Sequence, residues 1–409
     1  IGLPEDMLSS KSEALDAKPA RLAGPAPSPG DIALLQTAIG RAQRPLMIVG
    51  GPGWSRTVQQ KVEAFADRFD MPVACAFRFQ DYFDNRHRCY VGHLGFTTDR
   101  KLKAGLRVAD LVIAVGAEVA DIATEGYALL GGPGQTFVQV HPEPAALLGY
   151  RDAALVITAA SSAFTAQLAS FAPHLRAVAE GASGPRVWSC FRRDLRSAYE
   201  ETLQPRATPG AIRLEDVVAA VSARLPESGI VTNGAGNYSQ WVHRYFQSKR
   251  YRNALASTCG SMGYGLPAAI AAKLQHPDAP VVCFAGDGCF AMTASELGTA
   301  VQYGLPIVIV IANNGMFGTI RMHQERRYPG RPSGTTLVNP DFAALARAHG
   351  ANGFTITQSE DFAAALDDAL ASDRPSIIEL RLDPEAITPM ETLSGLRETA
   401  GVKESVTES

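Results

Sequence analysis

One carboxylate between two glycines, followed after 24 residues by an asparagine pair, is the part of the sequence best suited to chemistry. The residues are Gly286-Asp287-Gly288 and Asn313-Asn314. Carboxylate and amide oxygens are ligands that Mg²⁺ accepts together with water and phosphate oxygens. Glycines beside the aspartate allow backbone N–H groups to approach a phosphate. The alternative interpretation is a tight glycine turn next to an unrelated asparagine pair.

The elements around these residues predict that they meet at one edge of a sheet. The apolar run Val281–Ala285 is typical of a buried parallel strand, Thr293–Tyr303 has a helical pattern, and Pro306–Ile311 begins a second buried strand. This is a β-α-β unit. Ligands of open α/β sheets bind at the carboxyl ends of the strands, so we expect the aspartate and the second asparagine to lie close together there.

Composition excludes several classes of protein. The chain has 409 residues, 46% hydrophobic and 19% charged, which suits a globular protein of two or three domains. A net charge of −3 does not indicate a surface that binds nucleic acid. No apolar stretch indicates a membrane span, and no leader pattern indicates a signal peptide. Six scattered cysteines without a CxxC pair indicate neither a zinc site nor a disulfide framework. We therefore expect a cytoplasmic protein without membrane or nucleic-acid partners.

Helical and strand patterns alternate along the chain, and this predicts an α/β fold with two doubly wound parallel-sheet domains. Segments rich in Ala, Pro, Ser and Gly separate the domains. The predicted divisions are 1–30 as the tail of a missing N-terminal domain with a linker, 31–172 as a middle domain, 173–210 as a linker with a helix, 211–385 as a site-bearing domain, and 386–409 as a loose polar tail.

Two more segments complete a family pattern. Gly234–Trp241 is a glycine-containing loop after a predicted strand, and Cys259–Ala269 contains Gly-Ser-Met-Gly-Tyr-Gly-Leu-Pro. With the metal-type motif, almost the whole chain resembles the middle and C-terminal, diphosphate-binding domains of the acetolactate synthase-like branch of the thiamine diphosphate enzymes. The family's N-terminal pyrimidine domain has no counterpart in this sequence.

The resemblance implies a binding role for particular residues. Mg²⁺ would be held by Asp287, Asn314 and the carbonyl of Met316, and would bridge the diphosphate of the cofactor. The side chain of Met262 would support the bent cofactor, and the carbonyl of Gly260 would accept a hydrogen bond from its amino group. The other implied cofactor contacts are Ala235, Gly236, Asn237, Tyr238, Gly286, Gly288, Cys289 and Gly318.

The resemblance also implies the class of reaction, which is decarboxylation or carboligation of a small-molecule 2-oxo acid. The family's cofactor-activating glutamate belongs to the pyrimidine domain, so no catalytic residue is assigned in this chain. We expect the chain alone to be inactive, and the enzyme to be a homodimer or homotetramer with sites at subunit interfaces. A 2-oxo-acid decarboxylase, a 2-hydroxyacyl-thioester lyase and a non-catalytic nucleotide-binding α/β protein are alternatives. Retention of Asp287, Asn314 and Met262 argues against the last.

Departures from the biosynthetic acetohydroxyacid synthases concern the substrate pocket. Their Gln-Trp-Gln run is replaced by Met322-His323-Gln324. His323 is either a polar substrate contact or a surface histidine. The other candidate substrate contacts are Gln240, Thr319 and Ile320. The stretch with Arg326, Arg327, Tyr328 and Arg331 is either a solvated loop or an anion clamp.

The middle domain departs from the same synthases in its flavin-binding motif. Where they carry Gly-x-Arg-Phe-Asp-Asp-Arg, this chain has Gly116–Ile122 without the arginines, which argues against bound FAD. The turn Gly50–Gly53 is able to cradle a nucleotide phosphate. Pro52 removes one N–H donor there, and an ordinary strand-to-helix turn explains the glycines equally well.

Overall fold

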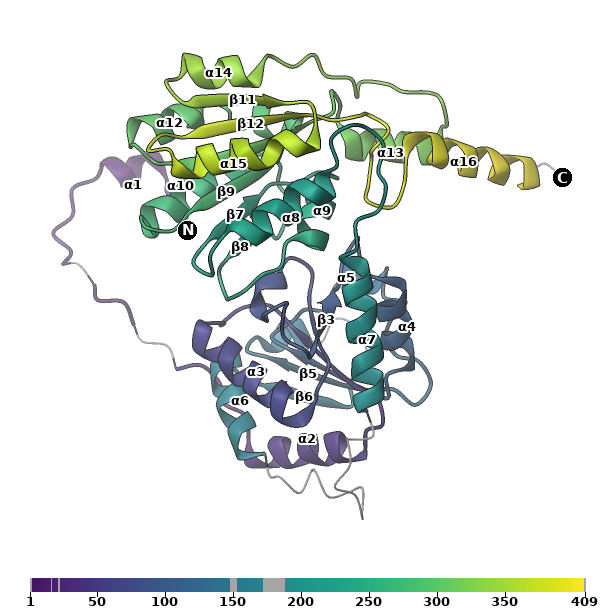
Figure 1. Cartoon of the computed structure of the whole chain (residues 1–409). Helices are drawn as coiled ribbons and strands as arrows, with labels where there is room; N and C mark the ends of the chain where they lie inside the picture. Colours follow the sequence, from purple (N-terminus) through teal and green to yellow (C-terminus); the bar gives the residue numbers. More distant parts are fainter. Residues whose placement is uncertain (1, 16, 21–22, 148–152, 172–187, 408–409) are drawn as a thin grey trace.

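Two parallel six-stranded sheets, one after the other along the chain, form the two lobes of the computed structural model (Figure 1). The structure describes residues 2–15, 17–20, 23–147, 153–171 and 188–407, with side chains up to residue 400. Each sheet is packed between two hydrophobic clusters, one on each face. The predicted α/β class with two doubly wound sheets is confirmed. Within the described residues, no helix is both long and apolar enough to cross a membrane.

The first sheet has the strand order β3-β2-β1-β4-β5-β6, and all its pairs are parallel. Alternate residues of one strand serve opposite faces: Leu46 and Ile48 enter one cluster, Met47 and Val49 the other. Burial on both faces explains why these strands are continuously apolar. The strands are β1 Pro45–Val49, β2 Val73–Cys75, β3 Tyr90–His93, β4 Leu111–Val115, β5 Thr136–His141 and β6 Leu155–Thr158.

Seven helices precede or accompany the first sheet in the described residues. Helix α2 has a complete capping box in which Ser28 accepts from the Asp31 N–H and the Asp31 side chain accepts from the Ser28 N–H. The helices are α1 Glu5–Ser9, α2 Pro29–Arg41, α3 Arg56–Phe69, α4 Arg100–Val108, α5 Asp121–Thr124, α6 Ser161–Gln167 and α7 Ser189–Thr202. Helix α7 is the helix expected in the linker; residues 173–187 of that linker lie outside the described residues.

The second sheet has the order β11-β12-β10-β9-β7-β8, again with parallel pairs throughout. Strand β8 lies at the outer edge, beyond β7. The chain therefore adds β8 on one side of β7 and β9 on the other, so the order of the strands reverses between β7 and β9. Such a switch point opens a crevice at the carboxyl ends of the strands. The strands are β7 Ile230–Asn233, β8 Ala254–Ala256, β9 Val281–Gly286, β10 Ile307–Asn313, β11 Asn352–Ile356 and β12 Ser376–Arg381.

The helices of the second lobe refine the predicted β-α-β unit. Asp287 does not lie in a free turn, because it begins the short helix α11. The helix predicted over Thr293–Tyr303 is present as the shorter α12, which ends at Gln302. Gly304 follows it with φ +58°, and the Leu305 N–H reaches the Ala300 carbonyl at 2.9 Å. The helices are α8 Leu214–Arg224, α9 Ser239–Tyr245, α10 Gly265–Gln275, α11 Asp287–Ala291, α12 Glu296–Gln302, α13 Gly318–Arg327, α14 Phe342–Ala348, α15 Phe362–Ala371 and α16 Leu393–Thr407.

Residues 393–407 form helix α16, so the prediction of a loose tail is wrong for this segment. Helix α16 packs against α13 and extends away from the lobe (Figure 1). Leu393 and Leu396 are buried, and the Arg397 guanidinium contacts the buried Glu325 carboxylate at 3.0 Å. Two apolar residues at a spacing of three and one ion pair were too weak a pattern to predict a helix among polar residues.

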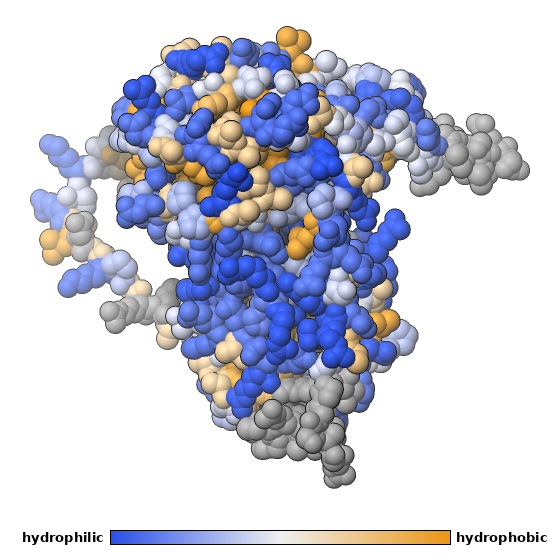
Figure 2. All heavy atoms as spheres, in the orientation of Figure 1, coloured by the Kyte–Doolittle hydropathy of each residue, from blue (hydrophilic) through white to orange (hydrophobic). Residues whose placement is uncertain are grey.

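Hydrogen bonds from the first lobe to residues 248–254 join the two lobes. The Asp81 carboxylate accepts from the Arg252 N–H at 2.8 Å, and the Gln59 side chain accepts from the Tyr251 N–H at 2.8 Å. The Ser248 N–H donates to the Asn85 side chain at 2.9 Å. In the view of Figure 2 the first lobe and the junction are mostly hydrophilic, while apolar residues gather on the second lobe.

Candidate functional site

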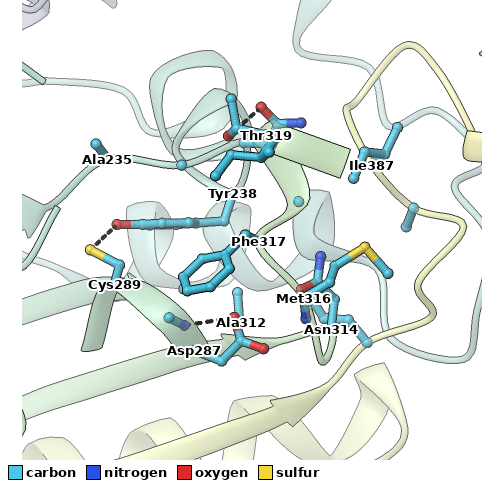
Figure 3. A pocket seen from close by; sticks show the side chains of 18 of the residues that line it. Ala235, Tyr238, Asp287, Cys289, Ala312, Asn314, Met316, Phe317, Thr319 and Ile387 are labelled. Carbon is cyan, nitrogen blue, oxygen red and sulfur yellow. Dashed lines mark hydrogen bonds between the residues drawn. The ribbon is translucent and has the colours of Figure 1, made fainter. Parts of the chain in front are cut away.

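A cavity of about 580 Å³ lies where the strands β7, β9 and β10 end (Figure 3). The loops after these strands and the start of α13 form its walls. Nearly all predicted cofactor and metal residues line it, together with the candidate substrate contacts Thr319 and Ile320. These residues are Ala235, Gly236, Asn237, Tyr238, Met262, Gly286, Asp287, Gly288, Cys289, Asn314, Met316 and Gly318.

The Asp287 carboxylate is buried and fixed by three donors. The Gly288 N–H donates to its Oδ1 at 2.8 Å, while the Gly315 N–H and the Asn339 side-chain amide donate to Oδ2 at 2.8 and 2.7 Å. Burial raises the pKa of Asp287 above its ordinary value, and these hydrogen bonds oppose the shift. A cation beside this carboxylate would add the charge that burial leaves uncompensated.

The two asparagines have different surroundings. Asn313 is buried in β10: its amide donates to Glu379 on β12 at 2.7 Å and its oxygen accepts from Asn339 at 2.9 Å. Asn314 is half-buried, and its side chain lines the cavity near Met316 (Figure 3). Its oxygen also accepts from the Met316 N–H at 3.2 Å. The first asparagine therefore anchors the loop, and the second faces the cavity.

The glycines around Asp287 are required by aromatic rings. A Cβ on Gly288 would lie 2.6 Å from the Phe317 ring, and one on Gly286 would lie 3.0 Å from the Tyr238 ring. Neither glycine has the positive φ that would require glycine on backbone grounds. We expected these glycines to bring N–H groups to a phosphate, which stays a prediction; the contacts with the two rings give them a packing role as well.

Cys289 joins three segments at the back of the cavity. Its sulfur accepts from the Gly263 N–H at 3.2 Å and from the Tyr238 hydroxyl at 3.4 Å. A Cβ on Gly234 would meet the same sulfur at 2.4 Å. These contacts tie the loops after β7 and β8 to α11, so the glycines of both loops serve close approach.

A polar cluster lies at the entrance to α13. The Asn237 oxygen accepts from the Thr319 hydroxyl at 2.9 Å and from the Gln240 amide at 3.3 Å. Gln240 lines a second cavity, about 840 Å³ in volume, which lies between the lobes. Thr319 lines both cavities, whereas Ile320 lines the first and is 53% exposed. The cluster thus forms the wall shared by the two cavities.

Gly260 and Met262 lie on different sides of this wall. Met262 lines the first cavity and packs against the core of the second lobe. Gly260 lines the interlobe cavity and has φ +79°, which favours glycine. Helix α10 begins at Gly265, so both residues belong to the loop that precedes it.

The structure leaves two sets of candidates outside the cavities. His323 is exposed on α13 and is absent from the described linings of both cavities, because the helix directs its neighbour Met322 inward and His323 outward. The basic stretch is also outside those linings. Arg326 pairs with Glu391 at 2.6 Å, and Tyr328 lies under its arginine neighbours. This geometry fits the surface histidine and the solvated loop better than the substrate contact and the anion clamp.

The glycines of the first lobe serve loop packing at its own switch point, between β1 and β4. A Cβ on Gly51 would lie 1.7 Å from the Gly116 carbonyl oxygen. The Trp54 indole donates to the Gly50 carbonyl at 2.7 Å, and the Tyr82 hydroxyl donates to the Gly51 carbonyl at 3.0 Å. These contacts account for the glycines without a nucleotide.

Asn339 is the site residue that sequence reasoning missed. It lies 52 positions after Asp287 in a segment without regular structure, and it contacts both Asp287 and Asn313. No local pattern marks it.

The candidate metal ligands differ from those of a transition-metal site. No group of three His, Cys, Asp or Glu able to hold an ion occurs among the described residues. One carboxylate with amide and carbonyl oxygens suits Mg²⁺ and phosphate oxygens.

Comparisons with known proteins agree with this geometry. Residues 234–380 match the family described as thiamine pyrophosphate enzyme, C-terminal TPP binding domain, and residues 32–168 match its central domain. The acetolactate synthase large subunit of Parasynechococcus marenigrum is 32% identical over 348 residues, 84% of this chain and 55% of that protein. The acetolactate synthase isozyme 2 large subunit of Escherichia coli is 30% identical over 348 residues, 84% of this chain and 61% of that protein. The chain thus spans little more than half the length of these relatives.

Proposed function

Because the chain belongs to the thiamine pyrophosphate enzymes, of which it contains the central and the C-terminal TPP-binding domains, we propose that its first cavity binds thiamine diphosphate with Mg²⁺. The observation that supports this most is the convergence of Asp287, Asn314, Met316 and Met262 on one cavity at the switch point of the second sheet. The diphosphate end would lie at Asp287, and the rings would lie against Met262.

The metal would be held by hard oxygen ligands. Asp287 supplies the charge, Asn314 an amide oxygen and Met316 its carbonyl oxygen. The fixed hydrogen bonds from Gly288, Gly315 and Asn339 orient the carboxylate before the ion arrives. Mg²⁺ held by these residues would orient the diphosphate and neutralise part of its charge.

Other side chains would position the organic part of the cofactor. Met262 offers an apolar support, and Gly260 offers a backbone carbonyl on the side of the interlobe cavity. When bound, thiamine diphosphate supplies the carbanion-stabilising chemistry that cleaves a bond next to a carbonyl carbon. The protein's part is to hold that group in one geometry and to exclude water from it.

We propose that the reaction is decarboxylation or carboligation of a 2-oxo acid. The relatives called acetolactate synthase support this class. For the isolated 409-residue chain we propose cofactor binding without turnover, and for the working enzyme a homodimer or homotetramer in the cytoplasm. A 2-oxo-acid decarboxylase or a 2-hydroxyacyl-thioester lyase is the alternative within the same cofactor class.

The test is pyruvate consumption with and without thiamine diphosphate, measured on the 409-residue chain and on the longest natural polypeptide that contains it. Acetolactate as the product supports carboligation, and acetaldehyde supports simple decarboxylation. Turnover by the 409-residue chain alone would contradict the proposed inactivity of the isolated chain. Absence of cofactor-dependent consumption of any 2-oxo acid by the longer polypeptide would contradict the proposed reaction.

A further inference from the structure

The interlobe cavity carries buried nitrogen atoms that lack hydrogen-bond partners. Nε and one terminal nitrogen of Arg78, and Nε2 of His243, are buried and unpaired in the part of the chain that the structure describes. Arg78 and His243 both line this cavity. Buried polar groups are normally satisfied, so three such nitrogens on one wall indicate a missing acceptor.

The charge of the cavity points to an anion. No Asp or Glu occurs among the described residues that line it, whereas the Arg78 guanidinium brings a positive charge. Burial lowers the pKa of His243 to about 3 and that of His93 to about 4, so both imidazoles are neutral at physiological pH. The guanidinium carbon of Arg78 lies 4.7 Å from the centroid of the Phe77 ring, and this cation–π contact compensates the positive charge only weakly. A buried unpaired cation is costly unless an anion reaches it.

Arg78 is held in an unusual backbone conformation that directs it to this place. Its φ is +67°, a region that non-glycine residues seldom adopt. A Cβ on Gly260 would lie 3.5 Å from a terminal nitrogen of Arg78, so the guanidinium lies beside the loop that also carries Met262. The cavity shares the wall of Ala235, Asn237 and Thr319 with the cofactor pocket. An anion held by Arg78 would therefore lie across this shared wall from the proposed cofactor pocket.

We propose that Arg78 and His243 form the subsite that binds the carboxylate of the 2-oxo acid. This rests on the proposed function and extends it, because it assigns the substrate's anionic group to a residue of the first lobe. The planar guanidinium donates two parallel hydrogen bonds to a carboxylate, and a neutral imidazole donates a third.

Cys259 offers a reporter that needs no turnover. Its thiol is exposed and lines the same cavity, and hydrogen bonds from Ser257 and Ser261 lower its pKa to about 7. Alkylation of this thiol by iodoacetamide at pH 7 can be followed by mass spectrometry. Cys190 is also exposed, lies on α7 and serves as an internal control in the same chain.

The experiment compares pyruvate with its neutral methyl ester, in the presence of Mg²⁺ and thiamine diphosphate. Saturating pyruvate should slow alkylation of Cys259 about fivefold or more, since a bound carboxylate blocks the thiol and disfavours its thiolate. Methyl pyruvate should give little protection, and Cys190 should react at an unchanged rate. The ratio of rates with and without pyruvate is taken separately for each variant, because loss of Arg78 also changes the basal reactivity.

Three variants decide the assignment. Arg78→Gln and His243→Phe should lose most of the pyruvate protection, whereas Arg374→Gln, which removes an exposed arginine elsewhere, should retain it. Without ligand, Arg78→Gln should not lower the melting temperature, because it removes a half-buried charge with two unpaired buried nitrogens. No protection of the wild-type chain by pyruvate, or equal protection in Arg78→Gln and His243→Phe, would overturn the proposal. Binding of thiamine diphosphate is measured separately, so failure of the cofactor proposal is seen independently of the alkylation result.

Discussion

The side-chain amide of Asn339 donates a 2.7 Å hydrogen bond to Oδ2 of Asp287. The same amide contacts the Asn313 oxygen at 2.9 Å, so one residue from a later segment connects the start of α11 with the end of β10. This contact fixes the orientation of the proposed metal carboxylate.

Replacing Asn339 with Ala should therefore weaken the binding of Mg²⁺ without removing a metal ligand. We expect the Mg²⁺ concentration for half-maximal thiamine diphosphate binding to rise about 10- to 100-fold, the usual effect of losing a group that orients a metal ligand. Titration calorimetry at a series of Mg²⁺ concentrations measures this. Val338→Ala is the matched control, because Val338 is fully exposed. An unchanged Mg²⁺ requirement in Asn339→Ala would show that the contact has no orienting role.

Met262 and Met316 line the same cavity but are assigned different atoms. Met262→Ala removes the apolar support and should raise the Kd for thiamine diphosphate about 5- to 30-fold, or about 1–2 kcal/mol. Met316→Ala keeps the backbone carbonyl and should leave the Mg²⁺ requirement unchanged. Calorimetry of the two variants under identical conditions compares them. A larger loss of Mg²⁺ dependence in Met316→Ala than in Met262→Ala would contradict the assignment.

Asp81 makes the junction between the lobes sensitive to pH. Burial raises the pKa of its carboxyl to about 7, and its hydrogen bonds from Arg252 and Ala254 only partly offset this. A raised folded-state pKa means that the folded protein binds the proton more tightly than the unfolded chain does. The stability from this group is thus complete below about pH 4 and is lost as pH rises toward 7.

Asp81→Asn should remove this pH dependence. An asparagine keeps an oxygen to accept from the Arg252 N–H but has no charge to bury. Melting temperatures should match the wild type at pH 4 and exceed it by several degrees at pH 8, with about 4 kcal/mol as the upper limit from a shift of about three pKa units. A variant less stable than the wild type at pH 8 would contradict this interpretation of Asp81.

His323 and Thr319 provide a test of which face of α13 contacts substrate. His323→Ala should leave the KM for a 2-oxo acid within about twofold, as expected of an exposed residue outside the described linings of both cavities. Thr319→Val removes the hydroxyl that donates to Asn237 and should raise the KM for the 2-oxo acid by more than about twofold. Steady-state assays of the longest natural polypeptide measure both. A larger effect at His323 would restore it as a substrate contact.

The sequence sufficed for the features that depend on local patterns. Buried parallel strands are continuously apolar, so Val281–Ala285 and Pro306–Ile311 revealed their positions and the edge at which Asp287 and Asn314 meet. Met262, which the family pattern assigns to the cofactor, lines the same cavity. The division of the chain into domains at residues 30, 172, 210 and 385 stays a prediction.

Contacts between distant segments could not be predicted. Asn339 joins the site from a segment without periodicity, and Arg78 enters the interlobe cavity from the first lobe through a positive φ that its residue type does not indicate. The packing of the glycines beside Asp287 against the rings of Tyr238 and Phe317 was likewise not predicted, because those rings come from other loops. Such reasons depend on tertiary packing, which one sequence does not display.

The central claim is that Asp287 and its neighbours bind thiamine diphosphate through Mg²⁺, and calorimetric titration of the 409-residue chain tests it directly. The wild-type chain and Asp367→Asn, which alters an exposed ion pair on α15, should bind thiamine diphosphate only when Mg²⁺ is present. Asp287→Ala and Asp287→Asn should bind it at least about 100-fold more weakly while keeping the wild-type far-ultraviolet spectrum. The same Kd in the Asp287 variants as in the wild type, or wild-type binding that needs no divalent cation, would contradict the account.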